Sequence, residues 1–237
     1  MPTIALTIQP DDEAPPARLE AWACAEDVVL DVVRPYLGEA LPGSAAAHHG
    51  LIVLGGHMGS YDDARYPWLG ATKRLIAEAI EREQPFLGVC LGHQLAAVAL
   101  GGVVALRPEG PARGMVHVLP TPEVFEDLVF SALPVGSQTL QWNNDVVTEL
   151  PTGATTLTTD VQGHPQTVRF GPRAWGVQCH PEATLEVVDT WIESEGTSPA
   201  GVHDLDRLRA EVHNGLPLMA TQWSASIRRF FGLVQQP

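Results

Sequence analysis

The sequence contains few cysteines and no pattern that joins them. Only Cys24, Cys90 and Cys179 occur in 237 residues, and none of them belongs to a CxxC motif. An odd number at wide spacing fits neither a disulfide framework nor a zinc site built on cysteine pairs. The histidines show no metal-ligand spacing either, so we expect no metal. Cys24 and Cys179 are predicted to be core residues, which leaves Cys90 to be explained.

Basic residues are also scarce. The chain has 14 Lys and Arg against 28 Asp and Glu, which gives a formal net charge of −14. An acidic surface repels the phosphate backbone, and no local cluster of basic residues offsets it. We therefore do not expect nucleic acid as a partner.

Long apolar runs are absent as well. No run approaches the roughly 20 residues of a membrane span, and no basic segment followed by an apolar one opens the chain. These absences predict a protein of the cytoplasm without a membrane partner. The phosphate-binding motif GxxxxGK[ST] is missing too, so we expect that the chain cannot itself activate an acceptor with ATP.

What is present in the first hundred residues is an alternation of strands and helices. Apolar and β-branched runs predict strands, and a helical repeat of apolar residues predicts helices between them. This order favours a mostly parallel sheet covered on both faces. The predicted strands are residues 3–10, 27–35, 50–56 and 85–89, and the predicted helices are 17–26, 66–83 and 92–102.

The pattern changes after Gly102. Short strand-like runs separated by Pro and Gly predict antiparallel strands, and helices return at 184–194 and 216–234. We expect one α/β domain over residues 1–237, with a flavodoxin-like core at about 4–182 and a helical extension at about 183–237. The short runs are residues 102–108, 115–120, 138–142, 154–160, 166–170 and 174–179.

Cys90 stands in the sequence GVCLG, the cysteine version of the G-x-S-x-G nucleophile elbow. A strand turns sharply into a helix there, and flanking glycines remove side chains that would clash. The helix N-terminus beneath the thiol favours a thiolate. The strand–turn–helix context favours a nucleophile over a buried structural cysteine between chance glycines.

A thiolate nucleophile needs a base, and the base needs a group that orients it. The stretch WGVQCHPE places His180 after a predicted strand and Glu182 two residues further on. Alone, this stretch reads as a surface His-Pro turn with a solvated glutamate. Paired with the cysteine elbow, it predicts an imidazole held by a carboxylate.

The combination of GVCLGHQ and GVQCHPE, after the loop VLGG, resembles the class I (triad-type) glutamine amidotransferases. The resemblance covers about residues 4–182 and implies a flavodoxin-like sheet. It implies Cys90 as nucleophile, His180 as general base and acid, and Glu182 as the orienting group. VLGGHMGSYDDARYPWL makes the chain most similar to free-standing members related to the glutaminase domain of GMP synthase. Plant γ-glutamyl peptidases share the same type of domain.

Chemistry and resemblance together predict the oxyanion hole. Attack on an amide carbonyl builds negative charge on oxygen, which backbone N–H groups must meet. We expect one N–H from Leu91 and the other from Gly56, where a glycine lets the backbone approach closely. A plain turn at Gly55 and Gly56 is the alternative.

The resemblance also implies the substrate contacts. Gln94 lies one helical turn after Cys90 and is expected to bind the backbone end of the substrate, together with main-chain groups of QWNND. That segment supplies Trp142, Asn143 and Asn144. The chain departs from its relatives in three places: His57 replaces a usual Pro, Asn143 a frequent His, and PARGMVHV (111–118) a strand with an acidic residue and GW.

These residues predict hydrolysis of the γ-amide of glutamine through a cysteine γ-glutamyl thioester. The reaction needs no metal and no organic cofactor. Ammonia would be released or passed to a separate synthetase or acceptor subunit. One alternative is a γ-glutamyl peptidase or hydrolase that acts on γ-glutamyl compounds. The other is a non-catalytic binding or regulatory module.

Overall fold

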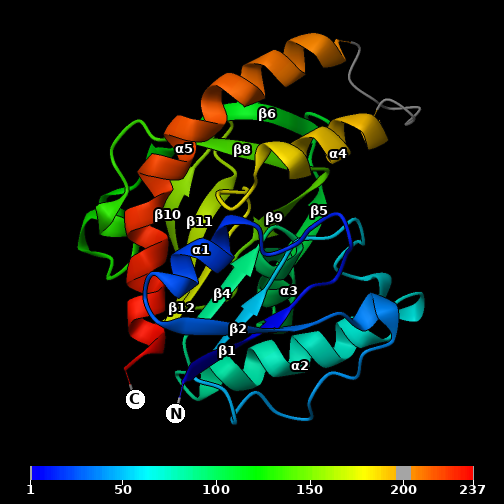
Figure 1. Cartoon of the computed structure of the whole chain (residues 1–237), viewed down its shortest axis with the longest axis vertical. Coiled ribbons are helices and arrows are strands. Elements are labelled where there is room, and N and C mark those ends of the chain that lie inside the picture. Colours follow the sequence, from blue (N-terminus) through cyan, green and yellow to red (C-terminus); the bar gives the residue numbers. More distant parts are fainter. Residues whose placement is uncertain (1, 196–203, 237) are drawn as a thin grey trace.

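The computed structural model describes residues 2–195 and 204–236. Its centre is an eight-stranded sheet with the strand order β2-β1-β3-β4-β12-β11-β10-β7 (Figure 1). The strands of this sheet are β1 (Thr3–Ile8), β2 (Val28–Val33), β3 (Gly50–Val53), β4 (Phe86–Val89), β7 (Leu119–Pro120), β10 (Thr155–Thr159), β11 (Pro165–Gly171) and β12 (Ala174–Val177).

Five neighbouring strands of the sheet are joined by parallel pairing, and the remaining three are added by antiparallel pairing. β2, β1, β3, β4 and β12 pair in parallel with one another. β11, β10 and β7 then continue the sheet in antiparallel register. The predicted fold class, a mostly parallel α/β sheet with an antiparallel portion, is confirmed.

Helices cover both faces of the sheet. They are α1 (Arg18–Cys24), α2 (Trp68–Glu81), α3 (Leu91–Ala99), α4 (Leu185–Glu195) and α5 (Leu205–Val234), with short 3-10 helices at Pro35–Leu37, Asp62–Ala64, Pro122–Glu126 and Phe130–Ala132. α1 contacts α5, and α2 contacts α3. In Figure 1, α5 is the long orange-to-red ribbon beside the sheet, and α2 lies at the opposite side.

The strands feed two hydrophobic cores, one on each face. Successive side chains of a strand point to opposite faces, so Leu51 and Val53 pack with α2 and α3. Ile52 between them packs with α1 and α5. This double burial explains why the central strands β3 and β4 are continuous apolar runs rather than alternating ones.

The second half of the chain differs from expectation in its pairing. Among the described residues, β5 (Val103–Leu106) pairs only with β9 (Asp145–Glu149), and β6 (Ala112–His117) pairs only with β8 (Gln138–Asn143). These four strands form two antiparallel ribbons outside the main sheet. The sequence does not predict β9, because Asn143, Asn144 and Asp145 resemble a turn.

Two other expectations are wrong. Helix α5 begins at Leu205, where the side chain of Asp204 accepts a hydrogen bond from the Arg207 N–H, and it continues through Pro217. The sequence predicts a helix over 216–234, because the apolar stripe that indicates it runs from Met219 to Val234. Cys24 is exposed rather than part of the core. The predicted extension also includes residues 196–203, which lie outside the described residues.

Among the residues that the structure describes, none of the helices has the length and apolar character needed to cross a membrane.

Candidate active site

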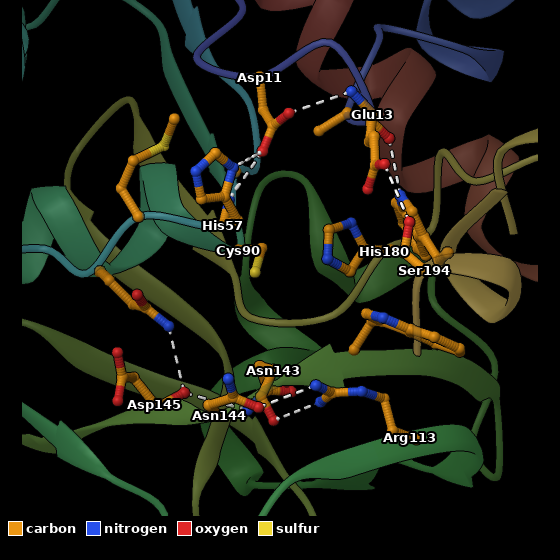
Figure 2. Close-up of a pocket in the computed structure, with 16 residues that line it drawn as sticks. Asp11, Glu13, His57, Cys90, Arg113, Asn143, Asn144, Asp145, His180 and Ser194 are labelled. Carbon is orange, nitrogen blue, oxygen red and sulfur yellow. Dashed lines mark hydrogen bonds and ion pairs between the residues drawn. The ribbon is translucent and has the colours of Figure 1, made fainter. Parts of the chain in front are cut away.

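Three neighbouring strands end at the place where the predicted catalytic residues meet. Gly55 and Gly56 follow β3, Cys90 follows β4, and His180 lies just beyond β12. Because β3, β4 and β12 are adjacent and parallel, their carboxyl ends lie at one edge of the sheet. Figure 2 shows Cys90 and His180 side by side in the pocket at this edge.

Cys90 occupies a strained turn between β4 and α3. Its φ of 49° and ψ of −102° lie in a region that residues other than glycine seldom adopt. The Cys90 N–H donates to the carbonyl of Val177 at 2.7 Å, which fixes the turn to β12. The side chain is 6% exposed, so the thiol is accessible only from the pocket.

The glycines around Cys90 are required by close backbone contacts. A Cβ at Gly88 would lie 2.6 Å from the carbonyl carbon of Gly92, and one at Gly92 only 2.0 Å from the carbonyl oxygen of Val53. A Cβ at Gly55 would lie 3.0 Å from Cε1 of His180. The sheet and the helix thus approach each other more closely than any side chain would allow.

His180 is held by Glu182. The ring Nδ1 lies 2.8 Å from Oε1 of Glu182, and both side chains are buried. The Nδ1–H therefore donates to the carboxylate, which leaves Nε2 to interact with the thiol. Trp191 packs edge-on against the imidazole, with ring centroids 4.7 Å apart.

The charge of His180 is set by its neighbours. Burial lowers the pKa of His180, but the carboxylate of Glu182 and the interaction with Cys90 outweigh it and raise the pKa to about 10. The imidazole is therefore cationic at neutral pH, which favours an ion pair with a thiolate.

The other buried thiol and imidazole near the site are neutral. Burial raises the pKa of the Cys179 thiol to about 12 and lowers the pKa of His93 to about 3. His93 packs against Phe170, with ring centroids 5.5 Å apart. The pKa of His93 is thus lowered, whereas that of His180 is raised.

His57 lies at the mouth of the pocket and is fixed on both sides. Asp11 Oδ2 accepts from the His57 backbone N–H at 2.9 Å and lies 2.5 Å from the ring Nδ1. The ring Nε2 is 3.2 Å from the hydroxyl of Tyr66. Asp11 thereby ties the loop after β1 to the loop that contains Gly56 (Figure 2).

The pocket has a volume of about 310 Å³ and includes most of the predicted site residues. Cys90, His180, Gly56, Gln94, Trp142, Asn143 and Asn144 line it. Leu91 and Glu182 are buried and do not line it. The predicted contribution of Leu91 is a backbone one, so a buried side chain is compatible with it.

The substrate-binding segment is fixed by hydrogen bonds around Asp145. The Asp145 carbonyl accepts from Nε2 of Gln94 at 3.1 Å and from Nδ2 of Asn143 at 3.0 Å. Oδ1 of Asn143 is buried and has no partner among the described residues. Arg113 donates to the carbonyl of Asn143 and to Oδ1 of Asn144.

Sequence reasoning did not predict several residues of the pocket wall. Glu13 accepts a hydrogen bond from Ser194 at 3.0 Å, and its carbonyl accepts from the indole of Trp191 at 2.7 Å. Arg113 lies over the ring of Trp142, 5.4 Å from its centroid. Arg113 lies in PARGMVHV, a stretch in which the sequence departs from its relatives, and this departure could have drawn attention to it. Nothing in the pattern of the chain pointed to Glu13 or Ser194.

A metal centre has no basis in the part of the chain that the structure describes, where no group of three or more His, Cys, Asp or Glu side chains could hold an ion.

The fold and the pocket together define an α/β protein with a thiol, an imidazole and a carboxylate at the carboxyl edge of its sheet. Residues 28–223 match the family described as glutamine amidotransferase class-I, and the chain belongs to this family. The resemblance predicted from the sequence is confirmed.

Related proteins include an amidotransferase-like protein and GMP synthases. The chain is 32% identical over 181 residues to the glutamine amidotransferase-like protein YfeJ of Salmonella typhimurium, and the match covers 73% of this chain and 72% of that protein. It is 31% identical over 166 residues to the glutamine-hydrolysing GMP synthase of Aeropyrum pernix. That match covers 68% of this chain but only 29% of the synthase, so the chain corresponds to a small part of the longer enzyme.

Solved structures agree with the fold. A glutamine amidotransferase from Thermotoga maritima superposes with a TM-score of 0.83 at 24% identity and full coverage of both chains. One from Methylobacillus flagellatus gives a TM-score of 0.83 at 21% identity, with 100% of this chain and 96% of that chain covered.

Proposed function

We propose that this chain hydrolyses the γ-amide of glutamine, with Cys90 as the nucleophile. The observation that supports this most strongly is the placement of one thiol on a strained turn beside a charged, carboxylate-held imidazole. Family membership supports the same reaction class. A non-catalytic module would have no need of this arrangement in a pocket.

Acylation begins with the His180 imidazolium and the Cys90 thiolate. The thiolate attacks the γ-carbonyl carbon, and a C–S bond forms as the carbonyl π electrons move to oxygen. His180 gives its Nε2 proton to the leaving nitrogen, and the C–N bond breaks. The products of this half-reaction are ammonia and a γ-glutamyl thioester on Cys90. Water then attacks the thioester carbonyl and gives a proton to Nε2 of His180. The C–S bond breaks, glutamate is released, and the thiolate–imidazolium pair is restored.

The oxyanion of each tetrahedral intermediate would be held by the backbone N–H groups of Leu91 and Gly56. Leu91 is the first residue of α3, so its N–H has no partner within the helix. Gly56 lines the pocket, and a Cβ there would lie 3.2 Å from the Leu91 side chain, so the two residues adjoin. One such donor contributes about 2.7–4 kcal/mol of transition-state stabilisation.

Ammonia formed in this pocket would leave the protein or pass to a separate synthetase or acceptor subunit. The sequence contains neither GxxxxGK[ST] nor the pyrophosphatase-type SGGxDS, two motifs of ATP-using enzymes. One relative, 35% identical over 104 residues, is a subunit of the glutamine-hydrolysing GMP synthase of Saccharolobus solfataricus. The match covers 43% of this chain and 53% of that protein. We infer a comparable division of labour here.

A second candidate is hydrolysis of γ-glutamyl compounds with a larger leaving group. The leaving nitrogen must lie near His180. Trp191 packs against the His180 ring, and Glu13 and Ser194 border the pocket on the same side (Figure 2). An amino acid or peptide would find contacts there that ammonia does not need. Gamma-glutamyl peptidase 5 of Arabidopsis thaliana is 23% identical over 186 residues, covering 77% of this chain and 73% of that protein.

A product assay tests the proposal and separates the candidates. The purified chain is incubated with glutamine and with a panel of γ-glutamyl dipeptides, and release of ammonia and of free amine are both measured. Turnover of either substrate that disappears in Cys90→Ala but persists in Cys24→Ser supports the thiol mechanism. Turnover retained in full by Cys90→Ala contradicts it. If neither turnover nor a γ-glutamyl adduct on Cys90 is found, the non-catalytic binding or regulatory module is favoured.

A further inference from the structure

Gln178 lies between the thiol of Cys90 and the side chain of Gln94. It follows β12 and is fully buried. Its Nε2 is 3.6 Å from Sγ of Cys90, and its Oε1 accepts from Nε2 of Gln94 at 3.1 Å. The backbone N–H of Gln178 donates to the carbonyl of Gln166 at 2.8 Å, which fixes this segment to β11.

The orientation of the Gln178 amide follows from its neighbours. The carbonyl of Asp145 can only accept, so Gln94 must direct its NH₂ group toward that carbonyl. The same NH₂ group meets Gln178, which must therefore present its oxygen to Gln94. Only the NH₂ group of Gln178 remains to face the sulfur. A flipped amide would bring two NH₂ groups together.

A buried thiolate needs donors other than water. Cys90 is 6% exposed, and removal from water disfavours the charged form of a thiol. His180 supplies one donor and a positive charge. The Gln178 NH₂ group is the other side-chain donor that the described residues direct at the sulfur.

We propose that Gln178 is a positioning residue that holds the Cys90 thiolate. It also connects the thiolate to Gln94, the residue expected to bind the backbone end of the substrate. This inference rests on the proposed role of Cys90 as nucleophile. The hydrogen-bonded series is the Asp145 carbonyl, the Gln94 amide, the Gln178 amide and the sulfur. Both protons of the Gln94 NH₂ group are used within it, so Oε1 of Gln94 is the atom left to contact substrate. An oxygen at that point accepts from the ammonium group of a γ-glutamyl substrate.

The test is the pH dependence of Cys90 alkylation by iodoacetamide. It is carried out in a Cys24→Ser background, because Cys24 is exposed and Cys179 is buried with a high pKa. Gln178→Met removes the donor at similar volume. Loss of one hydrogen bond to a charged group should move the midpoint of the rate profile about one pH unit higher.

The chain offers a matched control in Gln166. This residue is also a fully buried glutamine, on the neighbouring strand β11, and its amide atoms have no hydrogen-bond partner among the described residues. Gln166→Met should leave the midpoint unchanged. A Gln178→Met profile that coincides with those of the parent and of Gln166→Met would overturn the proposal.

Two further measurements keep the result unambiguous. If Gln178→Met does not fold, Gln178→Glu takes its place, because a carboxylate of the same size removes the donor and repels the thiolate. An unchanged midpoint in that variant also overturns the proposal. A parent protein in which Cys90 does not react at all, and in which Cys90→Ala retains turnover, instead disproves the proposed nucleophile. The two failures are therefore distinguishable.

Discussion

The charge on His180 depends on two side chains that lie close to it in a buried pocket. Glu182 and Cys90 raise the pKa of His180 to about 10 against the opposing effect of burial. The imidazolium therefore persists far above the ordinary histidine range. General acid catalysis by His180 should fall only as the pH rises through about 10.

Glu182→Gln tests this account. The variant keeps a hydrogen-bond acceptor but removes the negative charge, so the pKa of His180 should fall and the alkaline limb of kcat/KM should move to lower pH. The rate at neutral pH should fall by at least about tenfold, as expected for an orienting carboxylate in a triad. The measurement is kcat/KM against pH with a γ-glutamyl substrate. An alkaline limb at the same pH in both proteins would show that Glu182 does not set the charge of His180.

At the scale of single residues, Gly92 gives a second prediction, which concerns the stability of the fold. Gly92→Ala would place a Cβ 2.0 Å from the Val53 carbonyl oxygen, and the backbone must move to relieve the clash. We expect a loss of about 3 kcal/mol in the free energy of unfolding, at the upper end of overpacking effects. The measurement is urea denaturation.

The control for Gly92 is Gly232, in helix α5, where an added Cβ would meet nothing within 4 Å. Gly232→Ala should raise stability by about 0.5–1 kcal/mol, because alanine favours a helix over glycine. Equal effects of the two substitutions would refute the packing argument at Gly92.

At the scale of elements, a buried ion pair joins the ribbon of β5 and β9 to the main sheet. Arg107, just after β5, lies 2.7 Å from Asp160, which follows β10, and both side chains are buried. Burial raises the pKa of Asp160, but the hydrogen bonds from Arg107, from the His164 backbone and from Gln141 outweigh it and lower the pKa overall. Asp160 therefore stabilises the fold above its unfolded pKa, and this contribution is lost as the pH falls.

Arg107→Met should leave the Asp160 charge buried and unpaired. We expect a loss of about 3–5 kcal/mol at neutral pH, and a smaller loss at acid pH, where Asp160 is protonated in both states. Denaturation with urea at the two pH values measures the difference. The control is Arg82→Met, because the ion pair of Arg82 with Glu78 spans 4.0 Å at the surface. This substitution should change the free energy of unfolding by less than about 1 kcal/mol. A pH-independent loss in Arg107→Met would contradict the ion-pair explanation.

The regular elements could be predicted from the sequence where local pattern and tertiary packing agree. The central parallel strands β3, β4 and β12 are apolar and fully buried because both of their faces are covered, and the helices repeat apolar residues with helical spacing. Prediction failed where packing prevails over a local signal. Pro217 lies inside α5 because the buried side chains before and after it hold the helix together. Asp145 begins β9 although Asn-Asn-Asp favours a turn.

The site shows the same division. The proximity of Cys90, His180 and Glu182 could be predicted because the strand–turn–helix pattern and the HPE spacing are local patterns. The contacts of Gln178, Trp191 and Asp11 depend on side-chain directions from segments far apart in the chain, and no spacing encodes them. The fixed position of His57 likewise requires Asp11, which precedes it by 46 residues.

At the scale of the whole molecule, α5 belongs to the hydrophobic core that α1 also covers, on one face of the sheet. Its buried side chains, among them Trp223, Phe230 and Phe231, pack in one cluster with Leu87 and Trp175 of the central strands. Phe230 meets Trp175 with ring centroids 6.5 Å apart. We therefore propose that residues 1–237 form one folding unit.

A chain that ends at residue 182 should not fold. It would expose the apolar side chains that α4 and α5 cover, and it would lose contacts worth several kcal/mol for each large buried residue. We measure thermal unfolding by near-ultraviolet circular dichroism. The full chain should unfold in one cooperative transition, and the shortened chain should show no such transition. A cooperative transition at the same temperature in the shortened chain would contradict a single folding unit.

The most direct test of the account is the covalent state of Cys90 during turnover. The protein is mixed with glutamine or a γ-glutamyl substrate, quenched in acid within milliseconds to seconds, digested and analysed by mass spectrometry. We predict that the peptide containing Cys90 gains the mass of one γ-glutamyl group, that hydroxylamine removes it, and that the peptides of Cys24 and Cys179 remain unmodified. Substrate turnover by the same sample without any such adduct, and with Cys90→Ala equally active, would contradict the central claim.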